Sequence, residues 1–240
     1  MRRLRHCGKN DAGFSLAETI VGSFVALLVM GSAGAMFVSA IKSNRTSVAR
    51  LDTVNQGRVA VESMGRSLRT AVLPSQLDDA ASVNDTAFLV GEANSVSFFA
   101  NINNLGNTIG PSKVSYAINA AGSLIQTVQK PLPDPVNHDF KYCDATLASC
   151  AKTVLDLADG VQSTRPLFVY YDQNGTVIPY STTCPDGNPC LSGLDLGNVD
   201  AVDISVVLKQ PSATTIGATT YLLRVSLPNH DSIIRDNGGT

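Results

Sequence analysis

Glu18 is the ionisable side chain whose position in this 240-residue sequence most needs a chemical explanation. It lies at the start of the longest apolar stretch, because residues 19–41 form 23 consecutive positions without a charge. A charge in the middle of a membrane helix costs about 2.5–3.5 kcal/mol on insertion scales, and less near the helix end. The chemistry that Glu18 offers is ion pairing, since a carboxylate in a low dielectric needs a cation beside it.

Signatures of catalysis are absent from the sequence. It contains no G-x-S-x-G motif, no P-loop and no H-E-x-x-H motif. Asp172-Gln173-Asn174-Gly175 and Asp186-Gly187-Asn188 begin like calcium loops but lack the later glutamate, so both are interpreted as turns. We therefore expect a protein that is not an enzyme and that binds no cofactor and no metal.

The apolar stretch has the length of a membrane span. At a rise of about 1.5 Å per residue, 23 residues make a helix of roughly 34 Å, and the hydrocarbon core is about 30 Å thick. Residues 1–13 carry four basic side chains against one acidic side chain, which predicts a single pass with the N-terminus in the cytoplasm. A secretory signal peptide is the alternative, but its apolar region is usually only about 7–15 residues long.

A motif joins the basic segment to the apolar one. Gly13-Phe14-Ser15-Leu16-Ala17-Glu18 resembles, without a gap, the processing site of type IV prepilins and of the pseudopilins of type II secretion. The resemblance covers roughly residues 1–72. It implies that a prepilin peptidase cuts between Gly13 and Phe14, that the new Phe14 amine is methylated, and that the apolar helix stays attached. Glu18 of one subunit then pairs with the Phe14 amine of a neighbour during assembly.

A second helical pattern follows the apolar stretch. Residues 42–72 contain no proline, and apolar side chains recur at three- and four-residue steps. With no helix breaker near Ile41, we expect one continuous helix over residues 15–72, ended by Leu73-Pro74. The apolar positions are Val48, Leu51, Val54, Val61, Met64, Leu68 and Val72.

The same segment is basic. Residues 42–69 carry a net charge of +4, whereas the chain from Thr70 onward carries −8. Nucleic-acid binding is an alternative that we do not expect, because no aromatic residues are interleaved to stack bases. The first basic residues could instead contact lipid phosphates or the acidic head of an adjacent subunit. The basic positions are Lys42, Arg45, Arg50, Arg58, Arg66 and Arg69.

Short strands replace the helical pattern beyond Pro74, and turn residues separate them. Residues 168–177 form an expected hairpin, whose Tyr170-Tyr171-Asp172 resembles stretches in the heads of minor pilins and pseudopilins. The predicted fold class is α+β, pilin-like, with the long N-terminal helix packed on an antiparallel sheet. The expected strands are residues 87–90, 96–100, 113–118, 123–128, 167–171, 176–180, 201–208 and 221–227.

Loss of the leader would remove Cys7 and leave an even number of cysteines outside the membrane, which predicts disulfides. Among the three connectivities the local pairs are favoured, namely Cys143 with Cys150 and Cys184 with Cys190. Zinc is the alternative, but the C-x6-C and C-x5-C spacings are longer than the usual ligand spacing of about two to four residues.

Four regions follow: a cleaved leader (1–13), a transmembrane and filament-core helix (14–41), an amphipathic helix (42–72) and an extracytoplasmic β-rich head (73–240). The expected function is that of a structural subunit, a minor pilin, which moves from the cytoplasmic membrane into an extracellular or periplasmic filament. Its expected partners are prepilin peptidase, other pilin subunits, the assembly platform and, before assembly, membrane lipid. The alternatives are a J-type pseudopilin of type II secretion and a pilus-associated adhesin or DNA-uptake receptor.

Overall fold

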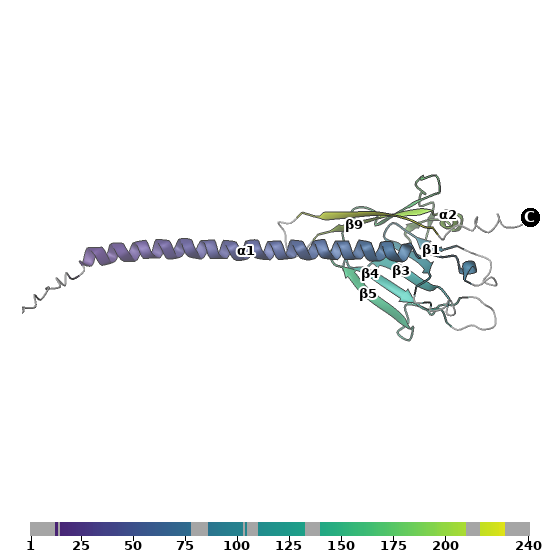
Figure 1. Cartoon of the computed structure of the whole chain (residues 1–240), viewed down its shortest axis with the longest axis horizontal. Coiled ribbons are helices and arrows are strands. Elements are labelled where there is room, and N and C mark those ends of the chain that lie inside the picture. The colour runs from purple at the N-terminus through teal and green to yellow at the C-terminus, as the bar shows by residue number, and fades with distance from the viewer. Residues whose placement is uncertain are drawn as a thin grey trace, which may run out of the picture. The chain divides into compact units, whose positions relative to one another are not determined.

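The computed structural model is α+β, as expected, with one long N-terminal helix and antiparallel sheets (Figure 1). Two compact units make up the chain, Met1–Val48 and Ala49–Thr240. The described residues are 13, 15–77, 86–102, 104, 110–132, 140–209 and 217–228.

Helix α1 (Leu16–Leu68) begins where the sequence predicts, because Ser15 caps it. The backbone N–H of Glu18 donates to Ser15 Oγ at 3.3 Å, and the Thr19 N–H donates to the Ser15 carbonyl oxygen at 3.1 Å. A serine at this position satisfies one of the N–H groups that the first turn leaves without an intrahelical acceptor. Residues 16–48 of α1 form nearly all of the described part of the first unit.

The second unit contains a five-stranded antiparallel meander, in which each strand pairs with the next. A second antiparallel sheet has the order β10-β9-β6, and a small hairpin pairs β7 with β8. The meander consists of β1 (Phe88–Gly91), β2 (Ser95–Ala100), β3 (Ser112–Ile118), β4 (Leu124–Gln129) and β5 (Lys152–Ala158). The other elements are the 3-10 helix η1 (Pro74–Gln76), β6 (Phe168–Tyr171), β7 (Thr182–Thr183), β8 (Pro189–Cys190), α2 (Gly193–Gly197), β9 (Ala201–Leu208) and β10 (Thr219–Ser226).

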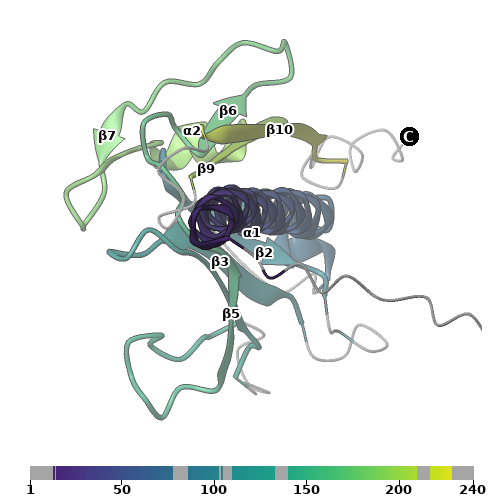
Figure 2. The ribbon, with the colours of Figure 1, turned by 90° about the vertical axis from the view of Figure 1, so that its left-hand side faces the viewer.

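The C-terminal part of α1 lies between the two larger sheets of this unit (Figure 2). On the side of the three-stranded sheet, the Tyr221 hydroxyl of β10 donates to the Thr53 carbonyl oxygen at 3.4 Å. On the side of the meander, the serines at positions 63 and 67 hydrogen-bond the Tyr116 hydroxyl of β3. The helix is thus the middle layer of the core, and aromatic side chains from both sheets are buried around it.

The buried face of α1 contains more small residues than the sequence predicts. Val48 and Leu51 are 58% and 64% exposed, although both belong to the predicted apolar face. Gly57 is buried instead, and a Cβ atom there would lie 2.2 Å from Tyr221 Cε2. Small side chains let β10 approach the helix closely. The buried helix residues are Thr53, Gly57, Ala60, Val61, Met64, Gly65 and Leu68.

Helix α1 ends four residues before the predicted end, because the chain joins the meander there. The Val72 N–H donates to the Phe99 carbonyl oxygen at 3.0 Å, and Ala71 forms a bridge with Ala100. An extended backbone partner thus replaces the last predicted helical turn. The helix stops before Pro74 is reached.

Most predicted strands are confirmed within one or two residues, but the strand expected over residues 176–180 is wrong. Only one bridge, Tyr171 with Val177, continues the hairpin beyond its turn. Pro179 has no N–H group to donate to a neighbouring strand, which limits a ladder at this point. Strand β5, by contrast, was not predicted, because its exposed residues do not alternate between apolar and polar.

Candidate functional site

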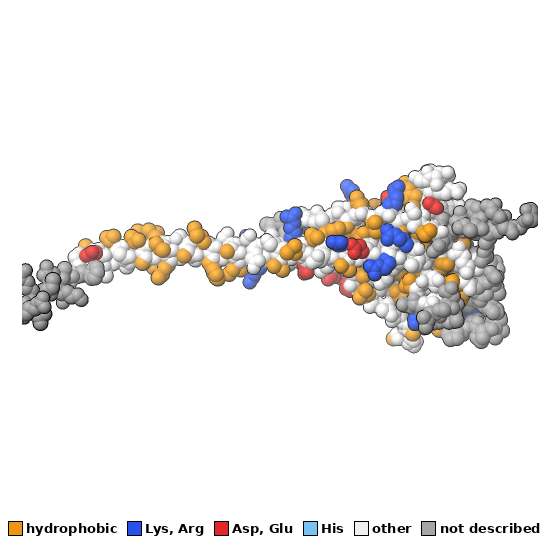
Figure 3. All heavy atoms as spheres, in the orientation of Figure 1, with side chains coloured by type: hydrophobic (Ala, Val, Ile, Leu, Met, Phe, Trp, Pro, Cys, Tyr) orange, Lys and Arg blue, Asp and Glu red, His pale blue; other side chains and the backbone are white. Residues whose placement is uncertain are grey.

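The first part of α1 exposes apolar side chains on all sides. Figure 3 shows those on one face. Large apolar residues in the range 16–41 are between 79% exposed, at Leu16, and 39% exposed, at Ile41. A helix that is apolar on all sides is normally buried in a large core or in a membrane. This helix is long and apolar enough to cross a membrane, as judged from its length and composition.

Several hydroxyl groups in this segment donate hydrogen bonds to the backbone of the helix itself. Ser23 Oγ donates to the Ile20 carbonyl oxygen and Ser32 Oγ donates to the Val29 carbonyl oxygen, both at 2.8 Å. In a hydrocarbon environment an unsatisfied polar group costs on the order of several kcal/mol. These internal hydrogen bonds therefore suit burial in lipid or among other helices.

The described members of the predicted processing and assembly set, Gly13 and Glu18, lie at the start of this helix. Gly13 is exposed and precedes the helix, whereas Phe14 lies outside the described residues. Glu18 is exposed in the first turn, where the positive end of the helix dipole favours an acidic side chain. The structure therefore brings Glu18 next to the cap formed by Ser15, and the predicted pairing of Glu18 with the Phe14 amine stays a prediction.

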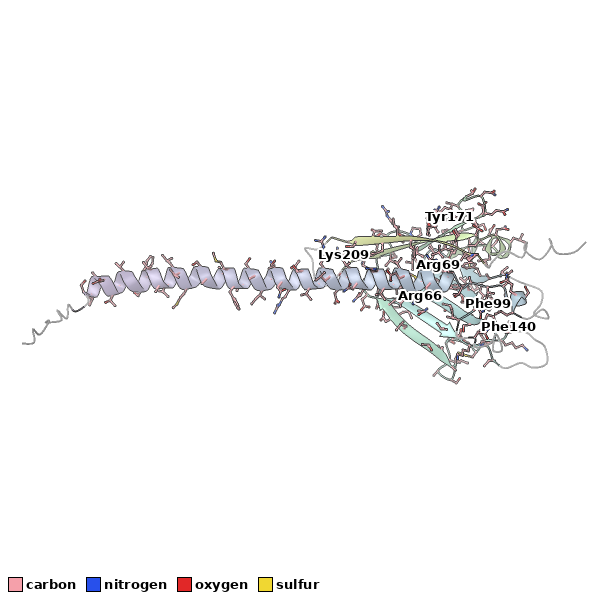
Figure 4. All side chains as sticks on the ribbon, viewed as in Figure 1. Arg66, Arg69, Phe99, Phe140, Tyr171 and Lys209 are labelled. Atoms are coloured by element: carbon pink, nitrogen blue, oxygen red, sulfur yellow. A yellow bond between two sulfur atoms is a disulfide. The ribbon has the colours of Figure 1, made fainter. Side chains whose placement is uncertain are left out.

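The arginines of the second half of α1 are exposed, and one of them is paired. Arg58 Nε lies 2.8 Å from Glu62 Oε1, an i,i+4 ion pair on the helix surface. Arg66 is in the last turn and Arg69 directly follows the helix (Figure 4), where positive charge offsets the negative end of the dipole. Part of the basic face is thus accounted for by the stability of the helix.

The first predicted disulfide joins Cys143 to Cys150, with 5.4 Å between their Cα atoms. It closes a loop in the connection between β4 and β5. Gln129, which is 2% exposed at the end of β4, donates from Nε2 to the Cys143 carbonyl oxygen at 2.8 Å. The buried amide fastens the closed loop to the sheet, and no signal in the sequence singled it out.

The second predicted disulfide joins Cys184 to Cys190 across the β7–β8 hairpin, with 5.7 Å between the Cα atoms. A buried carboxyl group lies beneath this loop. Glu92, which is 5% exposed, accepts a hydrogen bond from Ser95 Oγ at 2.7 Å and hydrogen-bonds the Asp186 side chain within the loop. Burial raises the pKa of Glu92, and the Asn188 backbone N–H lowers the pKa of Asp186. The surroundings therefore favour the protonated form of Glu92 and the ionised form of Asp186.

This carboxyl pair makes the stability of the head depend on pH. The pKa of Glu92 is higher in the folded state than in the unfolded state. Its contribution to the free energy of unfolding is therefore complete below the unfolded-state pKa and is lost as the pH rises through the folded-state pKa. Asp186 acts in the opposite direction, since its contribution is lost as the pH falls through its lowered pKa. The contribution of these two groups to stability is therefore greatest at mildly acidic pH, between the lowered pKa of Asp186 and the raised pKa of Glu92.

We expect Glu92→Gln to remove the loss of stability on the alkaline side, because the amide keeps a donor for Asp186 and cannot ionise. The measurement is the melting temperature between about pH 4 and pH 8. Glu62→Gln, at an exposed glutamate of α1, is the control and should leave the shape of the profile unchanged. An identical alkaline slope in Glu92→Gln and the unmodified protein would contradict the raised pKa of Glu92.

Both truncated calcium-like sequences form turns, as predicted. Asp172 Oδ1 accepts the backbone N–H groups of Asn174 and Thr176, at 2.9 and 2.8 Å, and Gly175 has a φ of 74°. Asp186 Oδ1 accepts the Asn188 N–H in the same way, at 3.0 Å. A surface cavity of about 530 Å³ lies beside the first turn, and its described lining contains Asp172, Asp195 and Asp200.

Each residue of Tyr170-Tyr171-Asp172 has a structural role. The buried Tyr170 hydroxyl donates to the Glu92 carbonyl oxygen at 3.1 Å, which ties β6 to the loop after β1. The Tyr171 ring lies 4.1 Å beneath the Arg224 guanidinium, which also forms two hydrogen bonds of 2.6 and 2.7 Å with Asp203. Packing within the head therefore accounts for the residues of the Tyr170-Tyr171-Asp172 stretch.

Comparison with known proteins adds no family to these observations. No family model matches the sequence, and no curated protein matches it at a significant level. The chemistry of the chain therefore has to follow from its own residues: the motif that ends at Glu18, the exposed apolar helix and the two disulfide loops.

Proposed function

We propose that this chain is a structural subunit of a type IV pilus or a related filament, a minor pilin, that enters the membrane and then the filament through its N-terminal helix. The observation that carries the proposal is the apolar surface of residues 16–41, exposed on all sides directly after the processing motif. Such a surface needs either lipid or neighbouring helices around it. The apolar helix of a pilin is surrounded first by the lipid of the bilayer and then by the helices of other subunits.

The motif fits a cut just before the helix. Gly13 is exposed and lies outside α1, whereas Ser15 already accepts hydrogen bonds from the first turn. Cleavage after Gly13 removes the basic leader and leaves the cap of the helix intact. The four basic side chains of residues 1–13 keep this end in the cytoplasm until then, and the head lies on the opposite side.

Glu18 gains its proposed role through cleavage. The new α-amine carries a positive charge at the positive end of the helix dipole, which is unfavourable. A carboxylate one turn into the helix offsets that charge, and in a bundle of subunits the partner carboxylate comes from a neighbouring chain. Because ion pairing strengthens in a low dielectric, one register between adjacent helices is favoured.

The head completes the proposed pilin-like design. The second half of α1 forms the middle layer between antiparallel sheets, and two disulfides close its loops. Disulfides persist in oxidising compartments outside the cytoplasm. This agrees with an extracytoplasmic head.

The direct test is the intact mass of the protein extracted from membranes. We expect a chain that starts at Phe14 and carries one added methyl group. Gly13→Glu is the matched variant, and it should retain all of residues 1–13 because the cleavage position is changed. A mature N-terminus at any other residue, or an unmodified Phe14 amine, would contradict prepilin processing.

A further inference from the structure

Strand β5 forms one edge of the five-stranded sheet, with β4 as its neighbour on the other side. Its first five residues, 152–156, are exposed on both faces of the sheet, and the strand enters the core only at Leu157 and Ala158. A strand in this position presents a row of backbone N–H and C=O groups that can pair with another chain.

The side chains of β5 do not protect this edge. Val154 is 53% exposed and Leu155 is 51% exposed, and successive side chains of a strand point to opposite faces. No proline interrupts residues 152–156, and the irregularity in the pairing with β4 comes after Asp156. The charged Lys152 side chain is turned back toward its own connection, because Nζ hydrogen-bonds the Ala145 carbonyl oxygen. Natural proteins usually protect such an edge with charges, prolines or bulges.

We propose that β5 pairs with β5 of a second copy of this chain, antiparallel and centred on Val154. In this register Val154 lies opposite Val154 of the second copy. Lys152 lies opposite Asp156, and the same pair occurs again across the two-fold axis. On pairing, Lys152 Nζ exchanges its exposed hydrogen bond to the Ala145 carbonyl oxygen for the Asp156 carboxylate. Opposite charges that face each other across an antiparallel pair are stabilising, whereas like charges are destabilising.

The sequence of the strand selects this register. Centring the pair one residue earlier or later places Lys152 opposite Val154 or Ala158, so that the lysine has no charged partner. On the other face of the sheet, Thr153 lies opposite Leu155, again twice. Asp156 makes no ion pair with another described residue, so its carboxylate is available to the second copy.

Cysteine cross-linking of the full chain tests the pairing. Residues that lie directly opposite in an antiparallel pair have Cα atoms about 4.5–5.5 Å apart, within the range that a disulfide spans. We expect Val154→Cys, in a Cys7→Ser background, to form a covalent dimer in membranes under mild oxidation. Peptide mapping should show the 154–154 link with the bond between Cys143 and Cys150 intact.

Leu155→Cys is the matched control, because it is on the same strand and equally exposed. Its counterpart in the second copy is a diagonal neighbour about 7–8 Å away, so little dimer should form. Equal dimer yields from the two cysteine variants would overturn the register, and a monomer from Val154→Cys would overturn the pairing itself.

Exchange of the charges supplies a second test. Asp156→Lys puts like charges opposite each other twice and should lower the dimer yield of the Val154→Cys chain about tenfold. Adding Lys152→Asp exchanges the two charges and should restore the yield, whereas failure to restore it would rule out the Lys152–Asp156 pairs. The cross-link should persist in a Glu18→Ala background, because it depends on the head and not on filament assembly.

Discussion

Replacing Glu18 with alanine is expected to leave the chain in the membrane and to abolish its recovery in sheared filaments. Insertion should be unimpaired, because removal of a charge makes a membrane helix cheaper to insert. Assembly should fail, because the Phe14 amine of a neighbouring subunit loses the carboxylate that offsets its charge. The measurements are the amounts of the protein in the membrane fraction and in the sheared fraction, with the intact mass as a check on processing.

Glu18 also stabilises the first turn of α1, so two further variants separate the pairing from the cap. Glu18→Gln keeps the size of the side chain without its charge and should assemble as poorly as Glu18→Ala. Ser15→Ala removes the hydroxyl that accepts the Glu18 N–H but keeps the carboxylate, and it should retain most assembly. If Ser15→Ala lost filaments as completely as Glu18→Gln, fraying of the helix would explain the defect, and the ion-pair role would be withdrawn.

Met64→Ala should destabilise the head by about 2–5 kcal/mol, the usual cost of truncating a large core side chain. Met64 is fully buried on the part of α1 that lies between the two sheets. Because domains have a net stability of roughly 5–15 kcal/mol, this loss is a large part of the total. The measurement is denaturant unfolding of the detergent-solubilised chain, monitored with a probe of tertiary structure in the head.

Val59→Ala is the control for this change. Val59 is on the same helix but is 58% exposed, so its truncation should alter the free energy of unfolding by no more than about 0.5 kcal/mol. Similar losses in the two variants would mean that the helix does not form the middle layer of the core.

Features that depend only on the local sequence pattern were predicted correctly. The start of α1 directly after Ser15 follows from a polar cap before an apolar run, and both disulfides join cysteines that are close in the sequence. The end of α1 could not be predicted in the same way. Val72 leaves the helix because Phe99, 27 positions further along, supplies a backbone acceptor.

The buried face of the helix shows why packing was harder to predict. Gly57 and Gly65 carry no apolar signal, yet both are buried because Tyr221 and Leu223 of β10 pack against them. Their burial depends on a strand more than 150 residues away. Leu51 is the opposite case, because it belongs to the predicted apolar face of the helix and yet is exposed.

The candidate functional residues likewise divide into those set by local sequence and those set by tertiary packing. The motif around Glu18 is a local sequence feature and was found directly. Glu92 and Gln129 were missed, because a lone polar residue in a strand-rich region gives no sign that it will be buried beneath a disulfide loop.

The middle-layer position of α1 has a mechanical consequence for the head. A tensile load directed along the helix would act parallel to the layers on both of its sides. Sliding the helix out would require the Met64 and Leu68 packing to break together with the hydrogen bonds made by Gln56 and Thr53. Shear of this kind loads all the contacts at once, whereas peeling loads them one after another. The arrangement thus lets the head resist a pull along the helix through its entire core.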